Sequence, residues 1–134
     1  MRYQDVLRVV LALAFFAGAG VNAYLALGVP EVYEEFADFS FLRVYRSLWR
    51  GMVLPRLRLW IALVILFEIA VGALLLSAGP YARLGLILAA LYTAFLVPFW
   101  WGGGGVVNIV LFLLMLWLLR FEYPESIISL IFGR

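Results

Sequence analysis

The sequence contains a stretch of 36 residues, Leu84 to Leu119, without a single charged side chain. A transmembrane helix needs about 20 mostly apolar residues to cross a hydrocarbon core of about 30 Å. The stretch is too long for one such helix and has the right length for two short ones. Four consecutive glycines, Gly102 to Gly105, favour a turn inside it. The sequence therefore predicts spans over residues 84–101 and 104–119.

Two further apolar segments complete an all-α fold, a bundle of four transmembrane helices. The first covers residues 6–28, and the second covers residues 57–78 and contains one acidic residue, Glu68. Of all residues, 67% are apolar and 13% are charged, whereas soluble domains are about half apolar and a quarter charged. These proportions exclude a water-soluble monomer. We expect residues 1–134 to form a single membrane domain.

The segment between the first two spans, residues 30–51, has the charge pattern of an amphipathic helix that lies in the membrane interface. Its acidic residues come first and its arginines last, which suits the helix dipole. Such a helix either caps the bundle or offers a docking surface to a partner. A second surface-lying segment is expected over residues 124–133. The side chains expected at the lipid interface are Arg43, Arg46, Arg50, Trp49, Trp100 and Trp101.

The orientation in the membrane follows from the arginines. Arg2 and Arg8 precede the first span and acidic residues follow it, which places the N-terminus in the cytoplasm. The first loop carries five arginines, and the rest of the chain also carries five. We expect a multi-pass protein of the cell membrane with both termini in the cytoplasm.

Three residue types are absent from the chain, and their absence excludes several kinds of catalytic and metal-binding site. There is no Cys, no His and no Lys, which excludes disulfides, thiolate or imidazole metal sites and Schiff bases on the chain itself. The net charge of +2 is too small to indicate nucleic-acid binding. We therefore expect no catalytic residue, no metal site and no cofactor attached to the chain, while a bound quinone or lipid remains compatible with the sequence.

Glu68 is the acidic residue that interrupts the otherwise uncharged second span. It lies about 16 Å deep by the rise of an α-helix, where an ionised and unpaired carboxylate costs several kcal/mol. Matching depths along the spans predict a polar cluster around it. Its predicted members are Glu68, Tyr92 and Thr93 near the midplane, with Asn22 and Asn108 toward one surface. Structural hydrogen bonding, contact with a ligand or quinone head group, and proton transfer are all open roles for Glu68.

Small residues recur every four positions in the first and third spans, and such spacing lets helices approach closely. These faces suit packing within the chain, self-association or contact with another membrane subunit. They are Ala14, Gly18 and Asn22; Ala19 and Ala23; Gly85 and Ala89; and Ala90 and Ala94.

Two segments resemble the DoxX family of small four-helix membrane proteins. One is Arg8 followed by Leu11, Phe15, Phe16, Ala17, Gly18 and Asn22, and the other is Glu68-Ile69-Ala70-Val71-Gly72-Ala73-Leu74-Leu75-Leu76 with Gly79 and Arg83. The resemblance covers about residues 6–119. The glycine turn and the long charged first loop depart from it. Glu68, Arg8 and Asn22 match positions that look characteristic of the family.

The resemblance implies that the chain works beside redox enzymes. DoxX-like proteins include subunits associated with thiosulfate:quinone oxidoreduction and membrane partners in thiol or superoxide defence complexes. Together with the small size and the missing catalytic residues, this favours a non-catalytic accessory or anchoring subunit of a membrane redox complex. The alternatives are a quinone-binding oxidoreductase component, with the quinone near Glu68, Tyr92, Trp100 or Trp101, and a small transporter. The expected partners are membrane lipids and other membrane subunits or a second copy of the chain.

Overall fold

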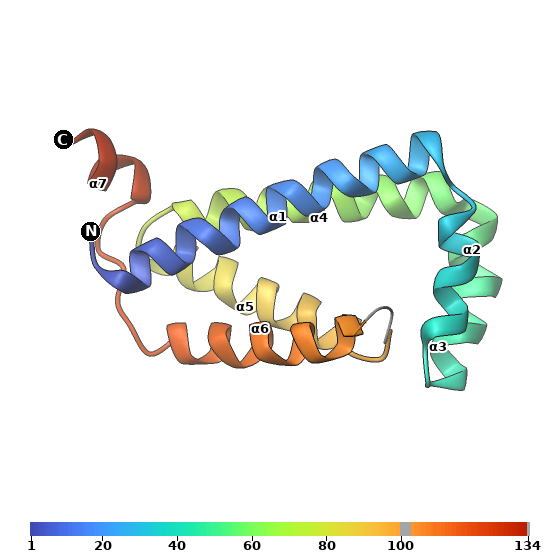
Figure 1. Cartoon of the computed structure of the whole chain (residues 1–134). Coiled ribbons are helices and arrows are strands. Elements are labelled where there is room, and N and C mark those ends of the chain that lie inside the picture. Colours follow the sequence, from blue (N-terminus) through green and yellow to red (C-terminus); the bar gives the residue numbers. More distant parts are fainter. Residues whose placement is uncertain (100–102, 134) are drawn as a thin grey trace.

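The computed structural model describes residues 1–99 and 103–133, and no named strand occurs among them (Figure 1). The all-α prediction is therefore confirmed for the described chain. Four longer helices form its body: α1 (Tyr3–Gly28), α4 (Leu57–Leu76), α5 (Gly79–Leu96) and α6 (Gly104–Leu118). Shorter helical segments connect α1 to α4, and a last short helix, α7 (Ile127–Phe132), follows α6.

Three stretches of helix are long and apolar enough to cross a membrane. They are α1, the helical run from Arg43 to Leu76 that contains α4, and α5. Helix α6 is also apolar but has only 15 residues, a length of about 22 Å at the rise of an α-helix. The chain thus has the helices of a membrane protein, and the fourth span stays a prediction.

Successive long helices pack side by side, α1 on α4, α4 on α5 and α5 on α6. Glycines allow two of these contacts. A Cβ at Gly72 would lie 2.8 Å from the ring of Phe16, and one at Gly85 would lie 2.9 Å from the backbone nitrogen of Leu75. The small residues of α5 are therefore used inside the chain. The buried core between the helices includes Leu11, Phe15, Val71, Leu75, Leu86, Ala89, Met115 and Leu118.

Helix α5 begins and ends about five residues earlier than the predicted span over residues 84–101. Pro80 lies in its first turn, where a fixed φ and a missing N–H are tolerated. Gly79, with φ of +54°, donates its backbone N–H to the Tyr123 carbonyl at 2.6 Å, which fixes the start. The predicted turn residue Gly102 lies outside the described residues.

The segment over residues 30–51 is broken into several short helices, so the prediction of one interfacial helix is wrong. Its parts are α2 (Val32–Phe36), the 3-10 turn η1 (Ala37–Phe39), α3 (Arg43–Leu48), the π-helical turn η2 (Trp49–Val53) and the 3-10 turn η3 (Leu54–Arg56). The break falls at Ser40, whose hydroxyl accepts the Leu42 backbone N–H at 3.2 Å. Such a local bond competes with helix formation. Gly51 does not end the helical run, which continues into α4.

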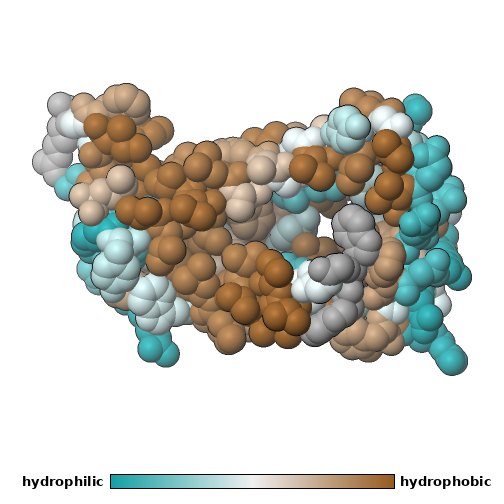
Figure 2. Space-filling view, in the orientation of Figure 1, coloured by the Kyte–Doolittle hydropathy of each residue, from teal (hydrophilic) through white to brown (hydrophobic). Residues whose placement is uncertain are grey.

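The broken segment is attached to the end of α5. Ser40 pairs with Phe99 in an isolated bridge, and the Phe41 N–H donates to the Pro98 carbonyl at 3.3 Å. In Figure 1, α2 and α3 lie across one end of α1 and α4, and both termini lie at the other end. Figure 2 shows hydrophobic surface between two more hydrophilic ends, the distribution expected of a protein that crosses a membrane.

Candidate functional site

Glu68 lies on α4 and faces both α1 and α5. The residue is 4% exposed. The side-chain amide nitrogen of Asn22 donates to both of its carboxylate oxygens, at 3.2 and 3.0 Å. The hydroxyl of Tyr92 donates to Oε1 at 2.9 Å. Glu68 of α4 is thus hydrogen-bonded to one side chain from α1 and one from α5. These partners supply the hydrogen bonds that a buried carboxylate needs.

Tyr33 of α2, which was not among the residues predicted from the sequence, extends the network. Its hydroxyl donates to Oδ1 of Asn22 at 2.8 Å, and the residue is 5% exposed. Burial, and after it the negative charge of Glu68, raises the pKa of the Tyr33 phenol. The signal in the sequence was the position of Tyr33 just after the first span, at the surface toward which Asn22 was placed.

Gly18 provides the space for the carboxylate. It lies one helical turn before Asn22 on α1, and a Cβ at this position would lie 3.0 Å from Oε1 of Glu68. That distance is tighter than ordinary van der Waals contact, so a side chain here would push the carboxylate away from α1 by a few tenths of an ångström. Gly20, two residues further along the same helix, has open space around it.

Two predicted members of the cluster are not bonded to Glu68. The Thr93 hydroxyl bonds the carbonyls of Ala89 and Ala90 in its own helix, both at 3.0 Å. Asn108 is partly exposed on α6, and its side chain makes no hydrogen bond to a described residue. Both residues were predicted near Glu68 from their depth along the spans. Depth does not reveal which way a helix faces, so the prediction could not exclude side chains that point elsewhere.

An apolar cavity of about 500 Å³, open to the surface on one side, lies beside the network, between α3, η2, α4 and α5. This volume falls within the range of about 300–1,000 Å³ that is typical of small-molecule sites. Tyr92 belongs to both features, because its ring forms part of the wall while its hydroxyl bonds Glu68. The lining residues are Tyr45, Leu48, Trp49, Met52, Val53, Trp60, Ile61, Leu63, Val64, Phe67, Tyr92, Phe95 and Phe99.

Aromatic rings dominate one side of this cavity. The ring centroid of Tyr92 lies 5.3 Å from that of Phe67 and 5.8 Å from that of Phe15. Tyr45 packs against Phe95 and Phe99 at 5.2 and 5.5 Å. These contacts line one side of the cavity with aromatic rings, which suits a flat or chain-like apolar ligand.

Trp49, which was predicted at the lipid interface, is partly exposed and packs against neighbouring rings. Its indole N–H donates to the Tyr33 carbonyl at 2.7 Å, and its ring packs against Phe36 and Phe99 at 5.2 and 5.5 Å. Trp49 therefore connects α2, η2 and the end of α5 around the cavity. Trp100 and Trp101, predicted at the same interface, lie outside the described residues.

The predicted interface arginines lie on the other side of α3. Arg43 and Arg50 are exposed, and Arg46 is partly exposed. Arg50 forms an ion pair with Asp38. This pair is at the surface, where such pairs contribute little to stability.

Arg8 lies at the opposite end of the molecule, where it has no accessible surface. Its guanidinium donates to the carbonyls of Leu75 and Ser77 at 3.0 and 2.5 Å, and to Asp5 at 3.3 Å. It also lies over the ring of Tyr123, 4.2 Å from the centroid. Arg8 thus satisfies carbonyls at the C-terminal end of α4, a structural role, and lies away from Glu68 as the sequence analysis expected.

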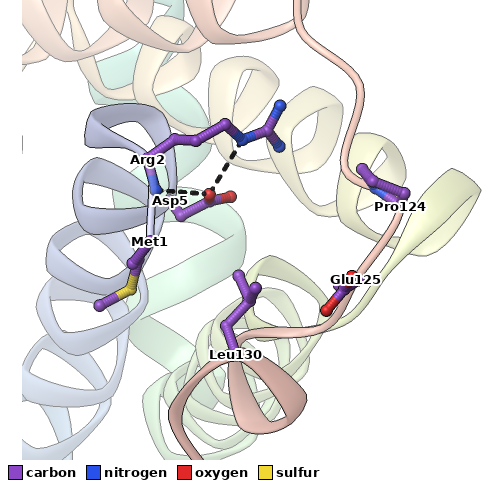
Figure 3. A pocket seen from close by; sticks show the side chains of 6 residues that line it. All are labelled: Met1, Arg2, Asp5, Pro124, Glu125 and Leu130. Carbon is purple, nitrogen blue, oxygen red and sulfur yellow. Dashed lines mark hydrogen bonds and ion pairs between the residues drawn. The ribbon is translucent and has the colours of Figure 1, made fainter. Parts of the chain in front are cut away.

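A small pocket of about 130 Å³ opens near this end, between the start of α1 and the chain before and within α7 (Figure 3). Asp5 accepts bonds there from both the backbone nitrogen and the Nε of Arg2, each at 3.2 Å. Its charge is therefore already balanced. The pocket lining is Met1, Arg2, Asp5, Pro124, Glu125 and Leu130.

No family model, no curated protein and no solved structure matches the chain. Among the described residues, no group of three His, Cys, Asp or Glu side chains could hold a metal ion. The candidate site is therefore defined by its own geometry, a buried carboxylate network next to an apolar cavity.

Proposed function

We propose that the protein is a DoxX-like membrane subunit without catalytic residues of its own, which holds a quinone or similar amphiphile for a partner redox complex. One observation carries the proposal: an apolar, aromatic cavity of about 500 Å³ whose wall includes Tyr92, the residue bonded to buried Glu68. A cavity of this size with an almost wholly apolar, aromatic lining suits the ring and chain of an amphiphile.

The hydroxyl of Tyr92 is engaged with Glu68 and does not face the cavity. A phenol has one proton to donate, and that of Tyr92 is donated to Glu68. The cavity lining exposes almost no polar surface, so Tyr92 contributes its ring to the wall. We therefore expect the ligand to be held by its apolar ring and chain, with similar affinity for the quinone and the quinol.

The proposal includes four spans with both termini in the cytoplasm. Helix α6 would be the fourth span, with its ends reaching the interface through local thinning of the bilayer. Much of its apolar surface is exposed, as at Val106, Val110 and Leu113, and lipid would cover it. An even number of spans agrees with the position of both termini at one end (Figure 1).

The test is a titration of the purified protein in detergent with a short-chain benzoquinone, in its oxidised and chemically reduced forms. Trp49 and Trp60 line the cavity, so binding will quench tryptophan emission. The Val64→Phe substitution fills the cavity and is expected to weaken binding about ten-fold or more, a loss of about 1.4 kcal/mol. Leu66→Phe is the matched control, because Leu66 on the same helix is 63% exposed.

A third variant separates a binding role of Glu68 from a structural one. Glu68→Gln keeps an acceptor for Tyr92 and nearly the same volume, but its amide nitrogen replaces one of the two oxygens that accept from Asn22. We therefore expect the protein to assemble with its stability lowered by about 1–3 kcal/mol. If the carboxylate acts on the ligand through the position of Tyr92, the folded variant also binds the quinone more weakly. Equal quenching of the parent protein, Val64→Phe and Leu66→Phe would contradict the proposal.

A further inference from the structure

Three arginines on α3 and η2 converge on one surface depression that the proposed function does not use. Arg43, Arg46, Ser47 and Arg50 line a pocket of about 350 Å³. The positions are separated by three and four residues, so the side chains lie on one face of the helical turn. No acidic side chain is part of the lining.

The charges of this arginine pocket are only partly balanced within the described residues. Arg50 pairs with Asp38, whereas no ion pair of Arg43 or Arg46 occurs within residues 1–99 and 103–133. Like charges at this spacing repel one another. An anion with several acceptor oxygens would relieve the repulsion, and guanidinium groups match the geometry of phosphate oxygens.

The opposite face of the same segment fixes the direction in which the arginines point. Tyr45, Leu48 and Trp49 line the apolar cavity, and Trp49 is bonded to the Tyr33 carbonyl. The arginine face is therefore held outward. It lies at the end of the molecule opposite both termini, where α3 packs beside the end of α5 (Figure 1). The exposed apolar residue Val44 lies next to it.

We propose that Arg43, Arg46, Ser47 and Arg50 form a binding site for the phosphate of an anionic phospholipid. The guanidinium groups bind the phosphate oxygens, the Ser47 hydroxyl donates a further hydrogen bond, and the acyl chains lie along the apolar residues beside α3. The site is separate from the quinone cavity and does not depend on it. A free phosphate ion has the same oxygens but no acyl chains, so the experiment distinguishes the two.

The test is native mass spectrometry of the delipidated full chain in detergent, with three lipids added in turn. Phosphatidylglycerol carries an anionic phosphate, phosphatidylcholine carries a phosphate compensated by choline, and diacylglycerol carries none. We expect phosphatidylglycerol to bind best and diacylglycerol least. Each arginine near an anionic head group strengthens binding about five-fold, so the double variant Arg43→Gln with Arg46→Gln should bind phosphatidylglycerol about 25-fold more weakly.

Arg56→Gln with Arg58→Gln is the matched control, since it removes the same charge from exposed arginines further along the same segment. It should retain phosphatidylglycerol binding within about two-fold of the parent protein. Equal losses in the two double variants would overturn the site, because they would indicate a general effect of net charge. Equal binding of all three lipids would also overturn it. Displacement of the lipid by inorganic phosphate at equal concentration would identify a soluble phosphate site instead and overturn the lipid assignment.

Discussion

At the scale of single residues, the site depends on a glycine as much as on the carboxylate. The Glu68 carboxylate lies against α1 at Gly18, and from there it reaches both the Asn22 amide and the Tyr92 hydroxyl. A buried polar group that loses such partners costs about 1–3 kcal/mol. The network therefore stabilises the contact between three helices and also sets the direction of the Tyr92 hydroxyl beside the cavity.

Gly18→Ala is expected to disrupt this arrangement. Its Cβ would lie 3.0 Å from Oε1 of Glu68, and overpacking of this kind costs about 1–3 kcal/mol. Thermal unfolding followed by circular dichroism in detergent measures the loss. Gly20→Ala is the control, because it lies on the same helix with open space around it, and it should be neutral or slightly stabilising. Equal melting temperatures for the two variants would contradict the role of Gly18.

At the scale of whole elements, the end of α4 depends on a side chain from α1. The last carbonyls of a helix lack partners within it, and Arg8 bonds two carbonyls there, those of Leu75 and Ser77. Asp5 balances its charge from the preceding turn of α1. The resemblance to DoxX proteins singled out Arg8 as a characteristic position, and the structure gives it a capping role. Burial raises the pKa of the neighbouring Tyr123 phenol, and the positive charge of Arg8 opposes that effect.

Arg8→Leu is expected to destabilise the protein by about 3 kcal/mol. It leaves two helix-end carbonyls without this donor and removes the buried partner of Asp5, and breaking a buried ion pair costs about 3–5 kcal/mol. Arg83→Leu is the control, since Arg83 lies near the same end on α5 but is exposed. Denaturant titration of both variants measures the difference. A loss of stability as small in Arg8→Leu as in Arg83→Leu would show that the cap is dispensable.

The sequence predicted the long helices well because uncharged apolar runs have few other folds available. It also predicted that Asn22 and Tyr92 lie near Glu68, since the depth of a residue follows from its position along a span. It could not predict which way each helix faces. Thr93 therefore bonds its own helix, and Asn108 makes no bond to Glu68. The break at Ser40 and the packing of Trp49 involve tertiary contacts with Pro98 and Phe99.

At the scale of the whole molecule, the broken segment between α1 and α4 lies across one end of the long helices and forms one side of the cavity. Helices α4 and α5 supply two of its walls, and α3 with η2 supplies the third. A π-helical turn such as η2 is often found at a functional site. The same segment carries apolar residues on the side of the cavity and arginines on its outer side. The described part of the chain thus combines a buried polar network, a ligand-sized cavity and a group of surface arginines.

The most direct test of the proposed function is the quinone content of the full chain after mild purification from its native membrane. Extracted quinones are quantified by mass spectrometry for the parent protein, Val64→Phe and Leu66→Phe, and co-purifying membrane subunits are identified in the same samples. We predict near-stoichiometric quinone and a redox partner with the parent protein and Leu66→Phe, and strongly reduced quinone with Val64→Phe. A parent protein that emerges alone and free of quinone would contradict the proposed function.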